Sequence, residues 1–189
     1  MRRLCFASGN RHKVAEIAAM LTPRGWTVEP LVLTVEEDAP TFAGNAEKKA
    51  RAALAQSGLA SLADDSGLEV DALGGAPGVL SARYAGAGHD DAANNAKLLG
   101  ALAGVADGAR TARFRCALVF VDGDGTRLAA EGTCEGRIGH APRGTGGFGY
   151  DPLFLIEGDA AGRTMAELAP RRKIVYHIAR GRSANWRKR

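Results

Sequence analysis

Two adjacent carboxylates, Asp64 and Asp65, follow the apolar residues 61–63 and precede a Ser-Gly pair. Residues 68–72 then alternate apolar and polar side chains, a pattern typical of a second short strand. We therefore expect the carboxylates at the end of a buried strand. Neighbouring carboxylates repel each other unless a cation lies between them, and a hard divalent ion such as Mg²⁺ is the usual solution. The alternative is an Asp-Ser-Gly turn whose side chains cap local amides.

A candidate phosphate site comes near the start of the chain. Residues 4–7 predict a short buried strand, and the spacing of apolar residues 14–21 predicts a helix. The Ser-Gly-Asn turn between them leaves backbone amides and the positive end of the helix dipole facing one point, where Lys13 adds a full charge. The alternative is a plain connection in which Ser8 or Asn10 caps the helix, since the sequence is not a Walker motif.

An acidic loop and a helix supply further polar groups. Residues 35–40 form the loop, and Thr41 is the expected N-cap of a helix over residues 42–56. Asn45 and Lys49 lie four residues apart and therefore share one face of that helix.

Residues 143–154 form a glycine-rich loop that contains two aromatic residues. Phe148 and Tyr150, separated by a glycine, can bring an aromatic face to a planar ligand. Asp151 can accept hydrogen bonds from the ring N–H groups of a purine. The loop is suggestive only in combination with the other motifs, because glycine-rich loops are common.

The remaining elements and the composition indicate one globular domain. Residues 111–121 and 126–138 predict two strands joined by a hairpin, and residues 92–102 predict a helix. At 189 residues, with 46% hydrophobic and 24% charged residues, the chain can bury a sizeable core in one domain, either undivided or with two lobes that share a sheet.

Cysteine usage and hydropathy bear on the compartment. The three cysteines form no Cys-x-x-Cys pair and lie in or beside apolar runs, which indicates reduced core residues rather than disulfides or a zinc site. No apolar run approaches the roughly 18 residues that cross a membrane, and the amino terminus lacks a signal-peptide pattern. We therefore expect a cytoplasmic protein without a membrane partner.

The net charge of +4 is unevenly distributed. Residues 171–189 hold eight of the 25 Lys and Arg residues and none of the 21 acids, which leaves residues 1–170 with a net charge of −4. A basic tail usually indicates a nucleic acid or anionic partner. Our hypothesis for this tail is a different one, a shifted reading frame.

Six segments taken together resemble the inosine triphosphate pyrophosphatase family, the non-canonical purine nucleoside triphosphate (dITP/XTP) pyrophosphatases. The match spans about residues 3–170 in order and spacing. The segments are Ser-Gly-Asn-x-x-Lys at 8–13, Thr-Phe-x-x-Asn-Ala with the following lysine at 41–49, Ala-Asp-Asp-Ser-Gly-Leu at 63–68, Leu-Gly-Gly-Ala-Pro-Gly at 73–78, Ser-Ala-Arg-Tyr-Ala-Gly at 81–86 and Gly-Gly-Phe-Gly-Tyr-Asp-Pro at 146–152.

This resemblance implies an α/β fold with a long mixed central sheet, flanking helices, and two lobes with an active-site cleft between them. It also implies a homodimer that binds no nucleic acid. The implied activity is Mg²⁺-dependent hydrolysis of ITP, dITP and XTP to the monophosphate and pyrophosphate, which cleanses the nucleotide pool.

The resemblance also implies a role for each matched residue. Asp65 corresponds to the metal-binding general base and Glu36 to a second metal-binding acid, and the candidate catalytic residues are Asp64, Asp65 and Lys49. The loop over residues 8–13 should hold the triphosphate. Residues 148–151 of the glycine-rich loop should receive the base. The candidate substrate-binding residues are Ser8, Gly9, Asn10, Arg11, His12, Lys13, Ser66, Phe148, Gly149, Tyr150, Asp151 and Lys173.

The sequence departs from the family after Pro170. The family continues with Glu-Lys-Asn, a substrate-contacting Ser-His-Arg and a closing helix, whereas this chain continues with Arg-Arg-Lys-Ile-Val-Tyr-His-Ile-Ala. Codons chosen for residues 173–179 and read from their third base encode Asn-Arg-Ile-Ser-His-Arg. Our hypothesis is that residues 1–170 form the pyrophosphatase domain and that residues 171–189 are translated from a shifted frame. Lys173 then matches the family by position alone.

Two other functions remain open at this stage. A Maf-type nucleotide pyrophosphatase has a related fold and a different base preference, although the ordered motifs argue against it. A catalytically inactive protein could instead hold a nucleotide and use its basic tail to contact nucleic acid, in which case its affinity for RNA should fall steeply with salt.

Overall fold

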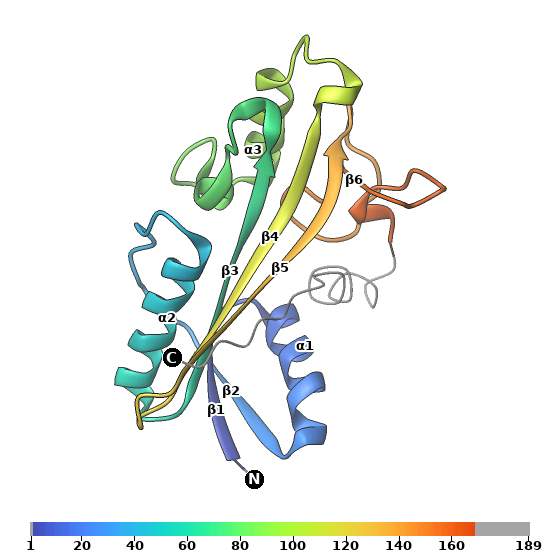
Figure 1. The fold of residues 1–189 in the computed structure, drawn as a ribbon. Coiled ribbons are helices and arrows are strands. Elements are labelled where there is room, and N and C mark those ends of the chain that lie inside the picture. The colour runs from blue at the N-terminus through green and yellow to red at the C-terminus, as the bar shows by residue number, and fades with distance from the viewer. Residues whose placement is uncertain (1, 169–189) are drawn as a thin grey trace. The chain divides into compact units, whose positions relative to one another are not determined.

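The computed structural model describes residues 2–168, and these residues form two compact units (Figure 1). The first unit comprises residues 2–65 and 116–131, and the second comprises residues 66–115 and 132–168. Lys173 and the predicted tail over residues 171–189 lie outside the described residues.

Strands and helices alternate at the start of the chain, and longer strands follow. The elements are β1 (Arg2–Ala7), α1 (Arg11–Leu21), β2 (Trp26–Leu31), α2 (Phe42–Ser57), β3 (Ser61–Val70), α3 (Asp91–Ala101), β4 (Thr111–Val121), β5 (Arg127–Ile138) and β6 (Phe154–Ile156). Short 3₁₀ turns connect several of them.

The strands form a six-stranded mixed sheet in the order β2-β1-β3-β4-β5-β6, within the described part of the chain. β1 pairs in parallel with both β2 and β3, and β5 pairs antiparallel with β6. A tight turn joins β4 to β5, as the Asp-Gly-Asp-Gly sequence predicts. The predicted α/β class with a mixed central sheet and flanking helices is thereby confirmed.

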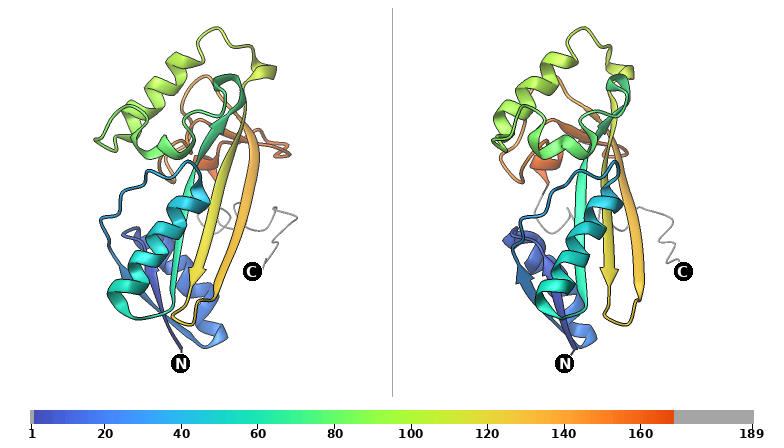
Figure 2. Two further views of the ribbon diagram at one scale, coloured as in Figure 1. Left: turned by 60° about the vertical axis from the view of Figure 1, so that its left-hand side comes forward. Right: turned by 90° about the vertical axis from the view of Figure 1, so that its left-hand side faces the viewer.

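In the first unit, α1 and α2 lie on opposite sides of β1 and β2 (Figures 1 and 2). Cys5 and Ala7 of β1 pack in one core cluster with small residues of α2, including Ala46 and Ala50. Alternate side chains of a strand point to opposite faces, so Leu4 and its even-numbered neighbours face the other way. Small alanines on α2 let the helix approach the sheet closely.

The N-terminus of α2 is capped as predicted. The Thr41 side chain accepts a hydrogen bond from Gly44 N at 3.1 Å, and Gly58 closes the helix in a left-handed conformation.

The second unit has its own core. Leu98 and Leu102, at the end of α3, pack with Leu68 and Val70 of β3 and with residues of β4, β5 and β6. Asp90 caps α3 through hydrogen bonds from the backbone amides of Ala92 and Ala93. The prediction of a helix after an exposed polar cap is confirmed.

One prediction about the strands differs from the structure. β3 is one continuous strand of ten residues rather than two short strands separated by a turn. β2 ends at Leu31 and contains Pro30, which an edge strand tolerates because one of its sides has no sheet partner.

None of the helices within residues 2–168 has the length and apolar content that a bilayer crossing requires.

Candidate functional site

Asp64 and Asp65 point to opposite faces of the sheet because they are consecutive residues of β3. Both are buried. The parallel register pairs Cys5 with Ser61 and Phe6 with Leu62, so the two carboxylates lie level with the chain just beyond the end of β1. The carboxyl end of a parallel strand is where ligands of α/β sheets bind.

Asp64 is paired with a lysine from α1. Lys13 Nζ lies 2.5 Å from Asp64 Oδ2. Burial alone would lower the pKa of Lys13, but the charge and the hydrogen bond of Asp64 outweigh it, with a smaller contribution from Asp65, and the pKa is raised. Lys13 is therefore a firmly charged cation at the carboxyl end of β1.

Asp65 is held from the opposite face by two side chains of α2. Asn45 Nδ2 donates to Asp65 Oδ2 at 3.2 Å, and Lys49 Nζ lies 3.3 Å from Asp65 Oδ1. Lys49 Nζ also lies 2.8 Å from Glu37 Oε1, so one ammonium group bridges two carboxylates. Burial raises the pKa of Asp65; Lys49 opposes this shift and the charge of Glu37 adds to it.

The prediction of one cation between the neighbouring carboxylates is wrong, because each of the two carboxylates faces its own lysine. Within residues 2–168, no three His, Cys, Asp or Glu side chains gather closely enough to hold a metal ion by themselves. Glu36, the predicted second metal ligand, is exposed, and it is Glu37 that joins Lys49 and Asp65. The role of Glu36 stays a prediction.

The loop over residues 8–13 forms the N-terminus of α1. Asn10 Oδ1 accepts from Lys13 N at 3.3 Å, and Ser8 Oγ accepts from Asn10 N at 3.2 Å. Asn10 therefore caps the helix, whereas Ser8 binds an amide of the turn before it, and two amides expected to face a phosphate are already occupied. Gly9 belongs to the turn before the helix, and Arg11 and His12 are the first two residues of α1.

The predicted aromatic pair divides into one exposed and one core residue. Phe148 is 59% exposed, whereas Tyr150 is 4% exposed and donates from its hydroxyl to Ser81 O at 2.8 Å. Asp151 is also buried, and its Oδ2 accepts from Phe148 N at 3.1 Å. Phe148 is thus the exposed ring of this pair, and the roles of Phe148 and Asp151 toward a purine base stay predictions.

Two residues of α3 hold this loop, and the sequence alone did not single them out. Asp91 Oδ2 accepts from Gly149 N at 2.7 Å, and Asn95 Nδ2 donates to Gly149 O at 2.9 Å. A hollow of about 490 Å³ lies between α3 and the loop, lined by these side chains and by Phe148. The spacing of four places both residues on one face of a helix, but their partner lies more than fifty residues away in the chain.

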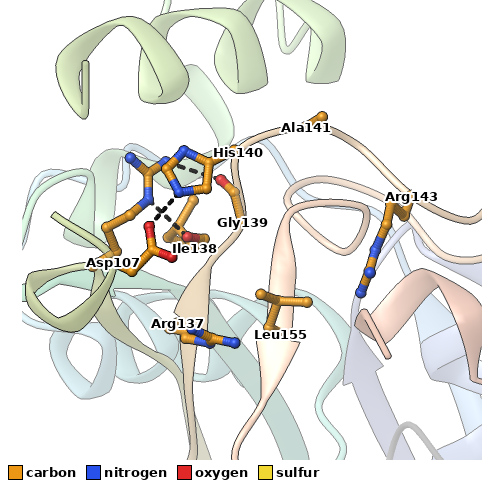
Figure 3. A pocket seen from close by; sticks show the side chains of 9 residues that line it. Asp107, Arg137, Ile138, Gly139, His140, Ala141, Arg143 and Leu155 are labelled. Atoms are coloured by element: carbon orange, nitrogen blue, oxygen red, sulfur yellow. Dashed lines mark hydrogen bonds and ion pairs between the residues drawn. The ribbon is translucent and has the colours of Figure 1, made fainter. Parts of the chain in front are cut away.

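A second hollow, of about 280 Å³, lies beside the ends of β5 and β6 (Figure 3). Its charged groups mostly hold the fold together. Arg110 donates to the carbonyls of Ile138, Leu102 and Gly139, all at 2.9 Å. His140 Nε2 contacts Asp107 at 2.5 Å and lowers the pKa of that carboxyl. We therefore assign the chemistry to the first unit's carboxylates and lysines.

The remaining predicted residues have simpler positions. Ser66 is half-buried on β3, immediately after Asp65, where the second unit begins. Asn45 and Glu37 complete the surroundings of Asp65, although neither belonged to the predicted set of site residues. Helical spacing already placed Asn45 on the same face as Lys49, whereas only the structure brings Glu37 to Lys49.

Comparison with known proteins gives a consistent result. The sequence model of the Ham1 family matches residues 4–184. A dITP/XTP pyrophosphatase of Desulforamulus reducens is 54% identical over 159 residues, which cover 82% of this chain and 79% of the relative. One of Methylococcus capsulatus is 50% identical over 178 residues, 91% of this chain and 88% of the relative.

Solved structures agree with the sequence relatives. A HAM1 protein from Coxiella burnetii superposes with a TM-score of 0.86 at 41% identity, covering 94% of this chain and 92% of that one. A nucleoside-triphosphatase, dITP/XTP pyrophosphatase, from Mycobacterium abscessus gives a TM-score of 0.78 at 41% identity, with coverages of 92% and 91%.

Proposed function

Because this chain belongs to the Ham1 family, we propose that it hydrolyses non-canonical purine nucleoside triphosphates, namely ITP, dITP and XTP, to the monophosphate and pyrophosphate. The family predicted from the six motifs is thereby confirmed. The names of the relatives at about 50% identity support the activity and the substrate class.

One observation carries the proposal: two lysines and two carboxylates gather at the carboxyl end of β1. Lys13 and Lys49 lie against Asp64 and Asp65, respectively. A triphosphate brings several negative charges, which these ammonium groups can neutralise as charge develops on the leaving pyrophosphate. In the absence of substrate, the carboxylates balance the same cations.

Asp65 is the candidate general base. Its pKa is raised mainly by burial, which brings its proton affinity closer to what abstraction of a proton from water near neutral pH requires. Asn45 and Lys49 both contact this carboxylate and fix its orientation. In this proposal Asp65 accepts a proton from the water that attacks the α-phosphorus, and Lys49 limits the charge that accumulates there.

The donor set fits Mg²⁺ as the cofactor. Mg²⁺ typically binds one or two protein carboxylates and completes its shell with water and substrate phosphates. Asp65 would hold it with an acid of the 36–37 loop, Glu36 or Glu37. When bound, Mg²⁺ would supply a Lewis acid that withdraws charge from the phosphate oxygens.

Phe148 is the candidate contact for the base. It is 59% exposed on a loop whose neighbouring residues are buried or hydrogen-bonded, so its ring is available for stacking on a purine. Discrimination against adenine then requires hydrogen-bond donors placed for the 6-oxo group of the base. Such donors would face the 6-amino group of adenine, which is itself a donor, and this mismatch costs far more than a lost apolar contact.

We also propose a cytoplasmic location and a homodimer, both of which the family resemblance implies. Light scattering coupled to size-exclusion chromatography tests the second. A mass near twice the 19.7 kDa of the chain supports the dimer, and a mass near 19.7 kDa contradicts it.

The experiment that tests the activity is release of pyrophosphate from ITP, XTP, GTP and ATP by the full chain with and without Mg²⁺. We expect turnover of ITP and XTP that requires the metal and exceeds turnover of ATP and GTP. Preference for ATP or GTP over ITP and XTP would favour a Maf-type enzyme. Binding of ITP without turnover would favour an inactive nucleotide-binding protein.

A further inference from the structure

Gly149 has both of its backbone polar groups bound by side chains of a single helix face. Its N–H donates to Asp91 Oδ2 at 2.7 Å, and its carbonyl accepts from Asn95 Nδ2 at 2.9 Å. These two side chains, one turn apart on α3, act together as a clamp on one residue of the glycine-rich loop. We call Asp91 and Asn95 the α3 clamp.

The clamp acts where the loop turns from the surface into the core. Gly149 has a φ of +59°, in the left-handed region that glycine adopts without strain. Phe148 before it is exposed, and Tyr150 after it is buried and bound to Ser81. The conformation at Gly149 therefore decides the direction in which the Phe148 ring leaves the loop.

Asn95 meets the clamp geometry at a cost. Its Oδ1 is buried and has no hydrogen-bond partner among the described residues. A buried unpaired acceptor is unfavourable, and it persists here because the amide is oriented so that Nδ2 reaches Gly149 O. Unsatisfied buried polar atoms of this kind are commonly found at functional positions.

Asp91 also contributes to α3 itself, independently of its bond to Gly149. It is an acid in the first turn of α3, where a negative charge interacts favourably with the helix dipole. Asp90 already provides the N-cap through its bonds to Ala92 N and Ala93 N. The bond from Gly149 is thus an additional function of Asp91.

We propose that Asp91 and Asn95 are positioning residues that hold Phe148 in place for stacking on the purine base of the substrate. The inference rests on the proposed function and deepens it, because it names residues that determine base binding without touching the phosphates. A loop already ordered before binding loses less conformational entropy when the ligand arrives. The clamp therefore acts on substrate affinity rather than on the hydrolytic step.

Steady-state kinetics of Asp91→Ala and Asn95→Ala test this role with ITP and with ribose 5′-triphosphate, which has no base. We expect KM for ITP to rise about tenfold, the size of a lost base–aromatic stack, with kcat retained. Kinetics with ribose 5′-triphosphate should match the wild type. Asp91→Asn keeps an acceptor oxygen for Gly149 N and should therefore have the wild-type KM for ITP. If Asp91 acted only through its negative charge at the start of α3, Asp91→Asn would raise KM as Asp91→Ala does.

Asp90→Ala is the matched control, because it weakens the start of the same helix and leaves both bonds to Gly149 in place. Hydrogen exchange of the peptide over residues 144–151 provides a readout without activity. We expect faster exchange in Asp91→Ala and Asn95→Ala than in Asp90→Ala. Equal exchange in all three variants, or an equal rise in KM with and without a base, overturns the positioning role.

The two proposals fail in different ways. Wild-type protein that neither hydrolyses ITP nor binds IMP in calorimetry overturns the proposed function and, with it, base positioning. Wild-type turnover of ITP with an unchanged KM in both alanine variants overturns the positioning role alone.

Discussion

Lys13 and Asp64 form an ion pair of 2.5 Å that joins the first turn of α1 to the middle of β3. Both residues also belong to the predicted site, so the pair can serve folding and substrate binding at once. Replacing one partner leaves the other buried or half-buried without its counter-charge. Stability and activity must therefore be measured separately at this position.

The change Lys13→Met is expected to lower the free energy of unfolding by about 2 kcal/mol, because it removes the cation that faces the buried Asp64 carboxylate. The double change Lys13→Met with Asp64→Asn should recover most of that stability, since it removes both charges of the pair. Urea unfolding of the four proteins of this cycle measures the coupling. ITP hydrolysis should stay low in the double variant, and a double variant with full activity would show that Lys13 has no role toward the triphosphate.

The change Asp65→Asn keeps the shape of the side chain and removes the candidate base. We expect kcat for ITP to fall by at least about 10²-fold, the typical contribution of a positioned general base. In the wild type, kcat should decline toward low pH as Asp65 takes up a proton and can no longer act as the base. Wild-type kcat in Asp65→Asn would assign the base to another residue.

The same substitution has a predicted effect on stability with a definite pH dependence. The folded-state pKa of Asp65 is raised, mainly by burial, so the folded chain binds this proton more tightly than the unfolded chain. The ionised carboxylate therefore destabilises the fold above its folded pKa, and the penalty disappears below the unfolded value of about 3.9. Asp65→Asn should be more stable than the wild type at pH 8, by a margin that shrinks as the pH falls toward 4. Urea unfolding across this range checks the sign, and a margin that grows toward acid would contradict it.

Phe148 and Tyr150 should respond in opposite ways to substitution. Phe148→Ala removes an exposed ring, so the free energy of unfolding should change by less than about 0.5 kcal/mol while KM for ITP rises. Tyr150→Phe removes the hydroxyl that binds Ser81 O and should cost about 1 kcal/mol of stability with KM nearly unchanged. Thermal unfolding and steady-state kinetics on both variants distinguish a ligand contact from a core residue.

The reading-frame hypothesis makes a prediction about the gene. The codons of residues 173–179, read from the third base of the codon of residue 173, should encode Asn, an arbitrary residue, Ile and then Ser-His-Arg. Sequencing of the coding DNA decides this, and codons incompatible with Ser-His-Arg would refute it. If the hypothesis is correct, a chain with the restored frame should hydrolyse ITP with a higher kcat/KM than this one.

Elements with a clear sequence pattern were predictable, as β4 and α2 illustrate. The strand predicted over residues 111–121 has those bounds, and the helix predicted over 42–56 is found at Phe42–Ser57. β3 was predicted as two strands because a Ser-Gly turn was expected directly after the two aspartates. They are tolerated there because Lys13 and Lys49 supply a cation on each face.

The candidate site was predictable to the extent that it depends on local order in the chain. Helical spacing placed Asn45 beside Lys49, and the structure brings both to Asp65. Recognition of the clamp on Gly149 required the fold, because no local pattern links α3 to a glycine more than fifty residues later. The sequence predicts the same ligand contact for Tyr150 as for Phe148, because residue type alone does not show that Phe148 is exposed and Tyr150 buried.

The first unit is discontinuous in sequence, since residues 116–131 return to it after the chain has passed through the second unit. Val119 and Val121, which lie in that returning segment, share a core with Ala7 and Ala63. A translation product or proteolytic fragment that stops at Asp65 therefore lacks part of its own interior. The carboxylates and lysines of the site can be studied in a smaller protein only if residues 66–115 are replaced by a short linker, so that the returning strands remain covalently attached.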